Sequence, residues 1–210
     1  MRVSFDIDGV LADFVWSFTN EAHILNGYAP DEIKENVEVF GTLRQKEWKF
    51  PWSEQFYEDV WARIDTIQNW WMSLDPLVSQ KDINAINNII RNHNVYFITS
   101  RKSTAGLNIE RQCQYWLDGI GIDASHATVI ATQAGKKHKL MNAMDIDCHI
   151  DDKPSIVKDI HHHSKAHSCV IDRPYNQDIP GLGFNPIRAF ATVEEYCEWI
   201  TQHSRSIEKN

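Results

Sequence analysis

The chain opens with a short apolar run that stops abruptly. Val3, Phe5 and Ile7 carry this run, and Gly9 ends it, which predicts a β-strand followed directly by a turn. From residue 13 to about residue 35, apolar side chains recur at helical spacing instead. Strands of open α/β sheets place functional groups at their carboxyl ends. We therefore expect residues that matter for function where the first strand ends.

Beyond residue 76 the pattern alternates regularly between short apolar runs and helical spacing. Strands are predicted over residues 94–99, 128–132, 148–151 and 168–172. Helices are predicted over residues 78–92, 103–118 (capped by Ser103), 136–144, 154–162 and 192–203. Repeated strand–helix–strand units imply right-handed crossovers and a parallel sheet covered on both faces. The pattern predicts a three-layer α/β core with an insertion after the first strand.

The insertion, residues 14–76, differs from the rest of the chain. It is crowded with aromatic residues and has no alternating strand pattern, and Ser53 is a candidate N-cap for a helix through residues 60–64. We predict a helical, aromatic-rich module here and a core formed by residues 1–13 and 77–210. Because so small a module has few aliphatic residues for a core, most of its aromatic side chains are expected to pack together, and only a few to contact a ligand.

Composition and charge narrow the classes of partner. The chain of 210 residues is 42% hydrophobic and 24% charged, as in ordinary soluble globular proteins. Its net charge of −8 argues against an extended nucleic-acid surface, which needs clustered Lys and Arg. An anionic substrate would have to be attracted locally, by a metal ion or a few basic groups.

Cysteine spacing and the amino terminus bear on the compartment. The four cysteines, at positions 113, 148, 169 and 197, form no Cys-x-x-Cys pair, which is typical of reduced, buried thiols. Met1 leads directly into the first predicted strand, and no apolar run approaches transmembrane length. We expect a cytoplasmic protein with no membrane partner.

Two acids follow the first strand. Asp6 and Asp8 are two residues apart and so lie on the same side of the chain. Carboxylates this close repel each other unless a cation lies between them. Such a pair either holds Mg²⁺ or sets a nucleophile beside a proton donor. On its own, the motif is equally compatible with two solvated acids at the end of a strand.

Further polar residues follow the other strands and favour a site. They are Thr99, Ser100 and Arg101 after the second strand, Lys136, Lys137 and Lys139 after the third, and Asp151 and Asp152 after the fourth. All of them fall at the carboxyl edge of the predicted sheet, the edge at which such sheets bind ligands. Acids after two strands, hydroxyls after another and lysines between them indicate one chemical site.

In this order, the motifs resemble those of haloacid dehalogenase (HAD) superfamily phosphatases. The resemblance covers nearly the whole chain and implies a HAD-like (Rossmannoid) core with a cap inserted after the first strand. Three segments are similar to the 5′(3′)-deoxyribonucleotidase branch: Asp8-Gly-Val-Leu-Ala-Asp-Phe, Trp70-Trp71-Met-Ser-Leu-Asp-Pro and Asp172-Arg-Pro-Tyr-Asn.

The resemblance implies a role for each acid. Asp6 would be the nucleophile that forms an aspartyl-phosphate, and Asp8 would act as general acid and then general base. Mg²⁺ would be held by Asp6, the backbone carbonyl of Asp8 and either Asp151 or Asp152, all hard oxygen ligands. The sequence leaves open which of the last two acids touches the metal.

The resemblance also implies groups that bind the phosphoryl oxygens. Thr99 and Ser100 would hydrogen-bond them, and a lysine would neutralise their charge. Lys136 suits this position best and Lys137 nearly as well, whereas Lys139, about one turn later, is interpreted as a surface residue. Arg101 is a further substrate-binding candidate.

Other candidates come from the insertion and the last loop. In the deoxyribonucleotidase branch, aromatic residues of the cap contact the base. Phe14, Trp70 and Trp71, at the two ends of the insertion, are therefore candidates for a stacking surface. Arg173 follows the fifth strand and would contact phosphate or pair with an acid.

The predicted function is a Mg²⁺-dependent phosphomonoesterase acting on (deoxy)nucleoside monophosphates. The sequence leaves three alternatives: the same chemistry on a sugar phosphate or a nucleic-acid end, a phosphotransferase, and a non-catalytic binding module. Small acidic α/β enzymes of this kind often form homodimers, but no residue identifies an interface. Base, sugar and 5′ or 3′ preference also stay open.

Overall fold

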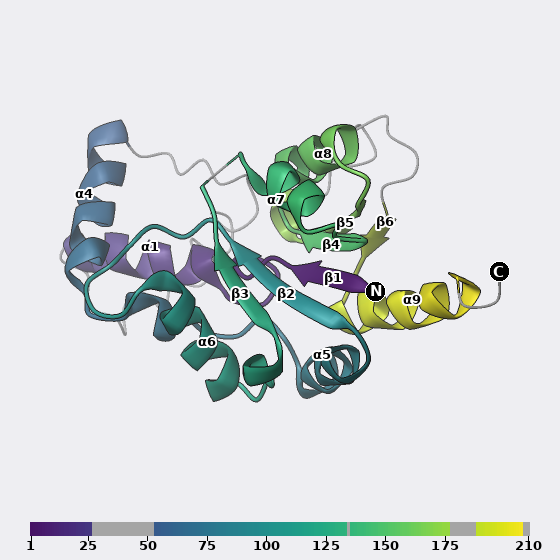
Figure 1. Ribbon diagram of the computed structural model, residues 1–210. Coiled ribbons are helices and arrows are strands. Elements are labelled where there is room, and N and C mark those ends of the chain that lie inside the picture. Colours follow the sequence, from purple (N-terminus) through teal and green to yellow (C-terminus); the bar gives the residue numbers. More distant parts are fainter. Residues whose placement is uncertain (27–52, 134, 177–187, 208–210) are drawn as a thin grey trace.

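A computed structural model describes residues 1–26, 53–133, 135–176 and 188–207 (Figure 1). At its centre lies a six-stranded sheet in the order β3-β2-β1-β4-β5-β6, in which all neighbouring strands are parallel. The strands are β1 (Arg2–Phe5), β2 (Asn94–Thr99), β3 (Thr128–Ala131), β4 (Cys148–Asp151), β5 (His167–Ile171) and β6 (Arg188–Phe190). β1, β2 and β4 thus lie side by side in the middle of the sheet, and their carboxyl ends carry the predicted motifs.

Helices cover both faces of the sheet, which confirms the predicted three-layer α/β architecture (Figure 1). On one face pack α5 (Gln80–Asn92), α6 (Ile109–Gly119) and α9 (Val193–Ile207), and on the other α7 (Lys137–Ala143) and α8 (Pro154–His163). In the described ranges no helix combines the length and apolarity needed to cross a membrane.

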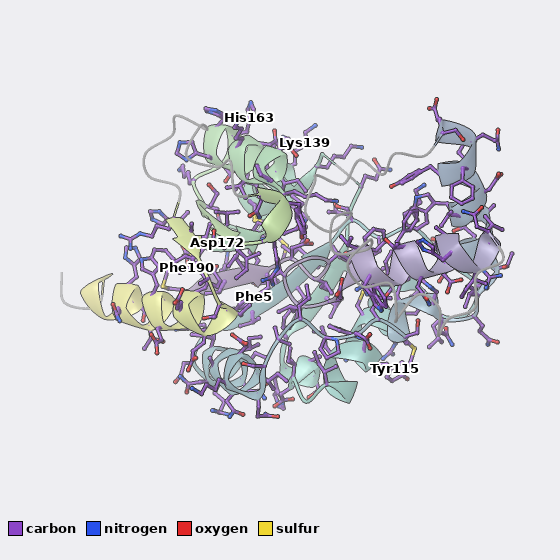
Figure 2. All side chains as sticks on the ribbon, turned by 180° about the vertical axis from the view of Figure 1, so that it is seen from behind. Phe5, Tyr115, Lys139, His163, Asp172 and Phe190 are labelled. Atoms are coloured by element: carbon purple, nitrogen blue, oxygen red, sulfur yellow. The ribbon has the colours of Figure 1, made fainter. Side chains whose placement is uncertain are left out.

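The larger core lies between the sheet and the first of these helical layers. Phe5 on β1 stacks on Phe97 of β2, with ring centroids 5.7 Å apart, and meets the edge of Tyr196 on α9. Phe190 of β6 meets the same tyrosine, with ring centroids 5.5 Å apart, and the view from behind shows Phe190 near Phe5 (Figure 2). These contacts fix the central strand, and therefore the position of the loop that follows it. The four cysteines are buried and unpaired, as expected.

The two ends of the inserted segment lie side by side. Asp13 N donates to Asp75 O at 2.8 Å, and Leu77 N donates to Leu11 O at 2.7 Å. Between these ends, the described elements are α1 (Phe14–Leu25), α4 (Glu54–Thr66) and the short 3-10 helix η1 (Trp70–Met72). α1 and α4 lie together beyond the carboxyl end of β1 (Figure 1). The boundary at residues 14–76 stays a prediction, and part of the segment, residues 27–52, lies outside the described ranges.

Local capping explains where these helices begin. The side chain of Asp13 accepts a hydrogen bond from Trp16 N at 3.0 Å, and that of Ser53 accepts one from Phe56 N at 3.2 Å. Each cap satisfies a backbone N–H group that has no partner within the helix. The prediction that Ser53 caps α4 is confirmed.

One predicted helix start was wrong, and one strand was missed. α6 begins at Ile109 and is capped by Asn108 rather than by Ser103, because the residues before it form a loop that packs on the insertion. In this loop Ala105 N donates to Asp65 O at 2.9 Å and Leu107 N donates to Asn69 Oδ1 at 2.8 Å. The strand β6 was not predicted at all.

Candidate active site

The loop after β1 turns back on itself tightly. Leu11 N and Ala12 N both donate to Ile7 O at 2.8 Å, while Asp6 N donates to Ile150 O of β4 at 2.9 Å. Gly9 lies in the turn with φ +76°, and a Cβ atom there would lie 2.2 Å from Asp152 Oδ2. Only glycine fits both this conformation and this close approach. The turn thus brings the first acidic motif against the second.

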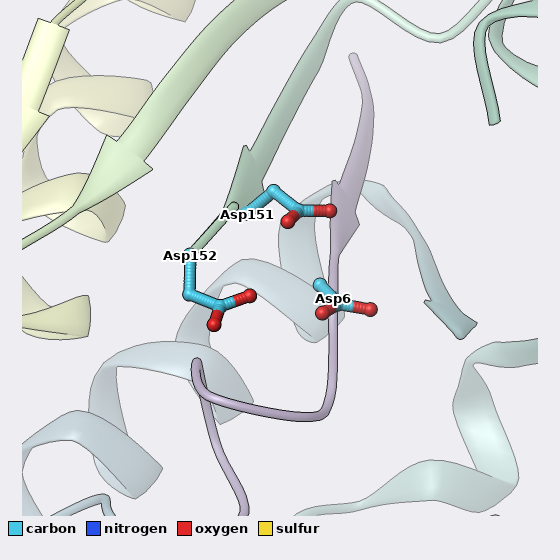
Figure 3. A group of neighbouring side chains, drawn as sticks. All are labelled: Asp6, Asp151 and Asp152. Atoms are coloured by element: carbon cyan, nitrogen blue, oxygen red, sulfur yellow. The ribbon is translucent and has the colours of Figure 1, made fainter. Parts of the chain in front are cut away.

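Three buried carboxylates meet at this edge of the sheet. Asp6, Asp151 and Asp152 each present an oxygen within 4.8 Å of the others, and they extend from the ends of β1 and β4 toward one another (Figure 3). Burial raises the pKa of Asp6 well above its ordinary value, opposed by Lys137 and reinforced by the neighbouring acids. Burial and Asp151 raise the pKa of Asp152 to about 7. The cluster therefore favours a bound cation.

Lys137 supplies one positive charge to this cluster. Its Nζ donates to Asp6 Oδ1 and to Asp151 Oδ2, each at 2.6 Å, and its side chain is 2% exposed. Burial alone would lower the pKa of Lys137, but Asp151 and Asp6 more than offset this and raise it. Lys137 therefore stays charged in the folded protein.

The preference for Lys136 over Lys137 does not agree with this geometry. Lys136 is exposed, and its amine donates to the side chain of Gln133. α7 begins at Lys137, and side chains in a first turn point back toward the amino end of the helix, here toward the carboxyl edge of the sheet. Lys139 lies at the surface, as expected (Figure 2).

Asp151 and Asp152 differ in what they bind. Asp151 accepts hydrogen bonds from Lys137, from His149 Nε2 at 3.3 Å and from Lys153 N at 2.9 Å, and Lys137 and His149 lower its pKa despite burial. Asp152 Oδ2 accepts from Tyr175 Oη at 2.6 Å. Its Oδ1 is buried and has no partner among the described residues.

This unpartnered oxygen bears on the question that the sequence left open. A buried carboxylate oxygen without a partner is costly, and a hard divalent cation is the partner that it suits. The residues present therefore fit a metal ion, and Asp152 has the oxygen available for it. Asp151 instead orients Lys137.

Asp8 and Thr99 meet a buried arginine. Arg101 Nη2 donates to Asp8 Oδ1 at 2.8 Å and its Nε to Asp8 Oδ2 at 3.0 Å, while Thr99 Oγ1 donates to Asp8 Oδ2 at 3.3 Å. Arg101 also donates to Cys113 Sγ at 3.2 Å and lies 4.6 Å from the ring centre of Trp71. Thr99 and Arg101 thus hold the side chain of Asp8 in this structure.

A cavity of about 150 Å³ opens beside these groups. Ser100 lines it, and its buried Oγ has no partner among the residues that the structure describes, so this hydroxyl can serve a ligand. The cavity extends from Asp6, Asp8 and Lys137 to the aromatic insertion. One connected space therefore joins the polar cluster to a set of aromatic rings.

Two of the three aromatic candidates line this cavity, and the third does not. Phe14 and Trp71 line it and stack on each other, with ring centroids 5.9 Å apart. Trp70 does not line it, because its indole points to Glu21 and donates to Oε1 there at 3.4 Å. Tyr57 and Trp61 of α4 line the cavity but were not singled out in the sequence. Their i, i+4 spacing, which puts both on one helix face, was the available signal.

Arg173 lies behind the loop and not in the cavity. Its Nε donates to Gly9 O at 2.6 Å and its Nη2 to Val10 O at 2.9 Å. The predicted phosphate contact and the predicted acid pair of Arg173 both stay predictions. Two of its guanidinium donors satisfy carbonyl groups that the tight turn leaves without strand partners.

His149 was not identified from the sequence. It is fully buried on β4, with Nδ1 2.8 Å from Ser4 Oγ and Nε2 on Asp151. Burial lowers the pKa of His149, only partly offset by Asp151. Its position two residues before Asp151, on the same side of the strand, was the signal for this contact.

No protein-family model matches the chain, and no curated protein matches it. Solved structures do. A haloacid dehalogenase-like family hydrolase from Streptococcus pneumoniae has a TM-score of 0.58 at 13% identity, over 95% of this chain and 97% of that one. A putative haloacid dehalogenase-like hydrolase from Burkholderia xenovorans has a TM-score of 0.55 at 10% identity, over 94% and 97%.

L-2-haloacid dehalogenase from Xanthobacter autotrophicus, with chloropropionic acid covalently bound, has a TM-score of 0.54 at 10% identity, over 95% and 98%. These similarities do not bear on the deoxyribonucleotidase branch, which stays a prediction. In each comparison, the similarity extends over nearly the full length of both chains. The chain therefore has the fold of the haloacid dehalogenase-like hydrolases.

Proposed function

We propose that the protein is a Mg²⁺-dependent phosphomonoesterase with Asp6 as its nucleophile. The observation that carries the proposal is the buried cluster of Asp6, Asp151 and Asp152. Lys137 binds two of these acids, and the third has an oxygen without a partner among the described residues. Such a cluster is suited to a phosphate dianion only when a cation offsets the repulsion between like charges.

The metal would be held by Asp6, Asp152 and the backbone carbonyl of Asp8. Bound there, Mg²⁺ would neutralise charge on the nucleophile and on the phosphoryl oxygens. Lys137 would add a second positive charge beside Asp6. Ser100 Oγ would donate to a phosphoryl oxygen, because it lines the cavity and lacks another acceptor in the described ranges.

The reaction would proceed in two displacements. Asp6 attacks phosphorus, the P–O ester bond breaks, and Asp8 gives its proton to the leaving oxygen. Water then attacks the aspartyl-phosphate, Asp8 accepts the proton from that water, and inorganic phosphate leaves. The proton donor at position 8 is what favours phosphate ester chemistry over dehalogenation. In this scheme an incoming phosphate competes with Asp8 for Arg101.

A nucleoside monophosphate is the proposed substrate. The cavity connects Asp6 with the rings of Phe14, Trp61 and Trp71, which offer an aromatic wall for a base. The insertion would act as a cap that keeps bulk water from the site. Trp71→Ala is expected to raise KM for a nucleotide more than for a non-aromatic phosphate, whereas equal changes would contradict base stacking.

The decisive experiment is a phosphate-release assay. A panel of ribo- and deoxynucleoside monophosphates and sugar phosphates is incubated with Mg²⁺ or with EDTA. We expect metal-dependent release from nucleotides, abolished in Asp6→Asn and retained in Asp145→Asn, whose carboxylate is 86% exposed. Release from sugar phosphates alone would keep the mechanism and discard the nucleotide substrate. No release from any ester would falsify the proposed function.

A further inference from the structure

One short turn contacts both acidic loops of the site. After β5, the residues Arg173 to Asn176, which include the 3-10 helix η3 (Pro174–Asn176), fold back on themselves, with Arg173 N donating to Asn176 Oδ1 at 2.8 Å. From this turn Arg173 reaches the carbonyls of Gly9 and Val10. Nothing in the proposed chemistry uses these residues.

The same turn holds Asp152 at two points. Asn176 Nδ2 donates to the backbone carbonyl of Asp152 at 2.8 Å, and Tyr175 Oη donates to its side-chain Oδ2 at 2.6 Å. Asn176 is 3% exposed and Asp152 is fully buried, so solvent has little access to the contact between them. Two adjacent residues, Tyr175 and Asn176, therefore fix the side chain and the main chain of Asp152.

The two oxygens of Asp152 consequently face different surroundings. Oδ2 lies against Tyr175 and against Gly9, since a Cβ on that glycine would lie 2.2 Å from Oδ2 and 2.6 Å from the tyrosine hydroxyl. Oδ1 is the buried oxygen with no partner in the described part of the chain. In Figure 3, one oxygen of Asp152 points toward Asp6 and the other toward the loop after β1.

We propose that Tyr175 is a positioning residue that occupies one oxygen of Asp152 and so makes this acid a one-oxygen ligand, which favours Mg²⁺ over Ca²⁺. Ca²⁺ takes six to eight oxygens and accepts two from a single carboxylate, whereas the smaller Mg²⁺ demands near-octahedral geometry. The proposal rests on the metal site of the proposed function. It adds a residue that determines which ion this site selects.

Tyr175→Phe removes the hydroxyl and keeps the ring. The substrate-free protein is titrated calorimetrically with Mg²⁺ and separately with Ca²⁺. We expect the Kd for Mg²⁺ to rise about 10-fold or more, the typical effect of losing a group that orients a metal ligand. The Kd for Ca²⁺ should rise less or fall, because the freed Oδ2 lets the carboxylate bind through both oxygens.

The matched control is Tyr115→Phe, at a tyrosine 48% exposed on α6. It should leave both dissociation constants at their wild-type values. Unchanged values in Tyr175→Phe, or equal losses for both ions, would overturn the proposal, with circular dichroism showing that the variant is folded. Wild-type protein that binds neither ion would overturn it as well.

Failure here is distinguishable from failure of the proposed function. Wild-type protein that binds Mg²⁺ but releases phosphate from no ester contradicts the function and leaves the ion preference measurable. Metal-dependent turnover together with an unaltered Mg²⁺ Kd in Tyr175→Phe contradicts only the role of Tyr175.

Discussion

At the scale of single residues, the site contains two buried oxygens that lack partners among the described residues, Ser100 Oγ and Asp152 Oδ1. One is a neutral donor and the other a carboxylate acceptor. Together they complement a phosphate bound to a cation. A group that is unsatisfied in the free protein but satisfied by a ligand costs stability and contributes to binding.

Ser100→Ala separates these two effects. The free energy of unfolding is expected to stay unchanged or to rise by about 1 kcal/mol, because an unsatisfied buried hydroxyl is removed. The rate constant kcat for phosphate release should fall roughly 100-fold, the typical effect of losing one donor to a reacting oxygen. Denaturant titration and the phosphate assay measure the two quantities.

Ser168→Ala is the matched control, since Ser168 Oγ on β5 is also buried and without a partner in the described ranges. It should show the same stability change and wild-type turnover. Full activity in Ser100→Ala would contradict the assignment of this hydroxyl to the phosphoryl group.

His149 gives a pH dependence with a definite sign. Because burial lowers its pKa, folded His149 stays neutral while the unfolded chain takes up a proton below about pH 6.5. The unfolded state then binds more protons, so His149 contributes stability above this pH that is lost as the pH falls. Between pH 6.5 and 5.5 the loss is at most about 1.4 kcal/mol.

Comparison with His149→Asn removes this titration, while Asp151, whose pKa is lowered, stays ionised throughout the pH range measured. Denaturant titrations from pH 5.5 to 7.5 should show a smaller loss on acidification in the variant. His126→Asn is the control, because a hydrogen bond to Asp123 raises the pKa of that exposed histidine and its removal changes the slope in the opposite sense. Parallel curves for wild type and His149→Asn would contradict the assignment.

At the scale of elements, the sequence predicted what local physics decides. β2 and β4 have the predicted bounds, and the continuous apolar run over residues 95–98 of β2 is typical of a strand in a parallel sheet. The cap at Ser53 was predictable because an N-cap acts within three residues. Ser103 met the same local rule, but it does not cap α6. Tertiary contacts with the insertion decide the conformation of residues 102–107 instead. β6 has three residues, two of them exposed, which is too short for a pattern.

The loop that displaced the predicted helix start is itself testable. Gly106 has φ +103°, and a Cβ there would lie 2.2 Å from Asn69 Oδ1, the atom that accepts Leu107 N. Gly106→Ala should lower the free energy of unfolding by about 2 kcal/mol through backbone strain and overpacking. Gly119→Ala, where the Cβ meets nothing within 4 Å at the end of α6, should leave it unchanged or raise it by up to about 1 kcal/mol. Equal denaturation midpoints for both variants would contradict this account.

At the scale of the whole molecule, the sequence predicted which residues gather but not how they pair. Parallel strands carry Asp6, Thr99 and Asp151 to one edge of the sheet, and this follows from topology alone. Whether Lys136 or Lys137 faces inward depends on the residue at which α7 begins, and helix ends are not determined by local sequence to one residue. The pairs of Arg101 with Asp8 and of Tyr175 with Asp152 depend on packing between segments far apart in the sequence.

The antiparallel contact between residues 11–13 and 75–77 has a consequence for how the chain can vary. The polypeptide leaves the core and returns to it at hydrogen-bonded neighbours. The insertion is therefore attached to the core at one point, like the loop of a hairpin, and its length does not alter this attachment. Lengthening the intervening segment raises the entropic cost of closing this loop only slowly. It leaves the hydrogen bond from Asp6 N to Ile150 O in place. Under the proposed function, such a junction would let selectivity and reactivity diversify independently of each other.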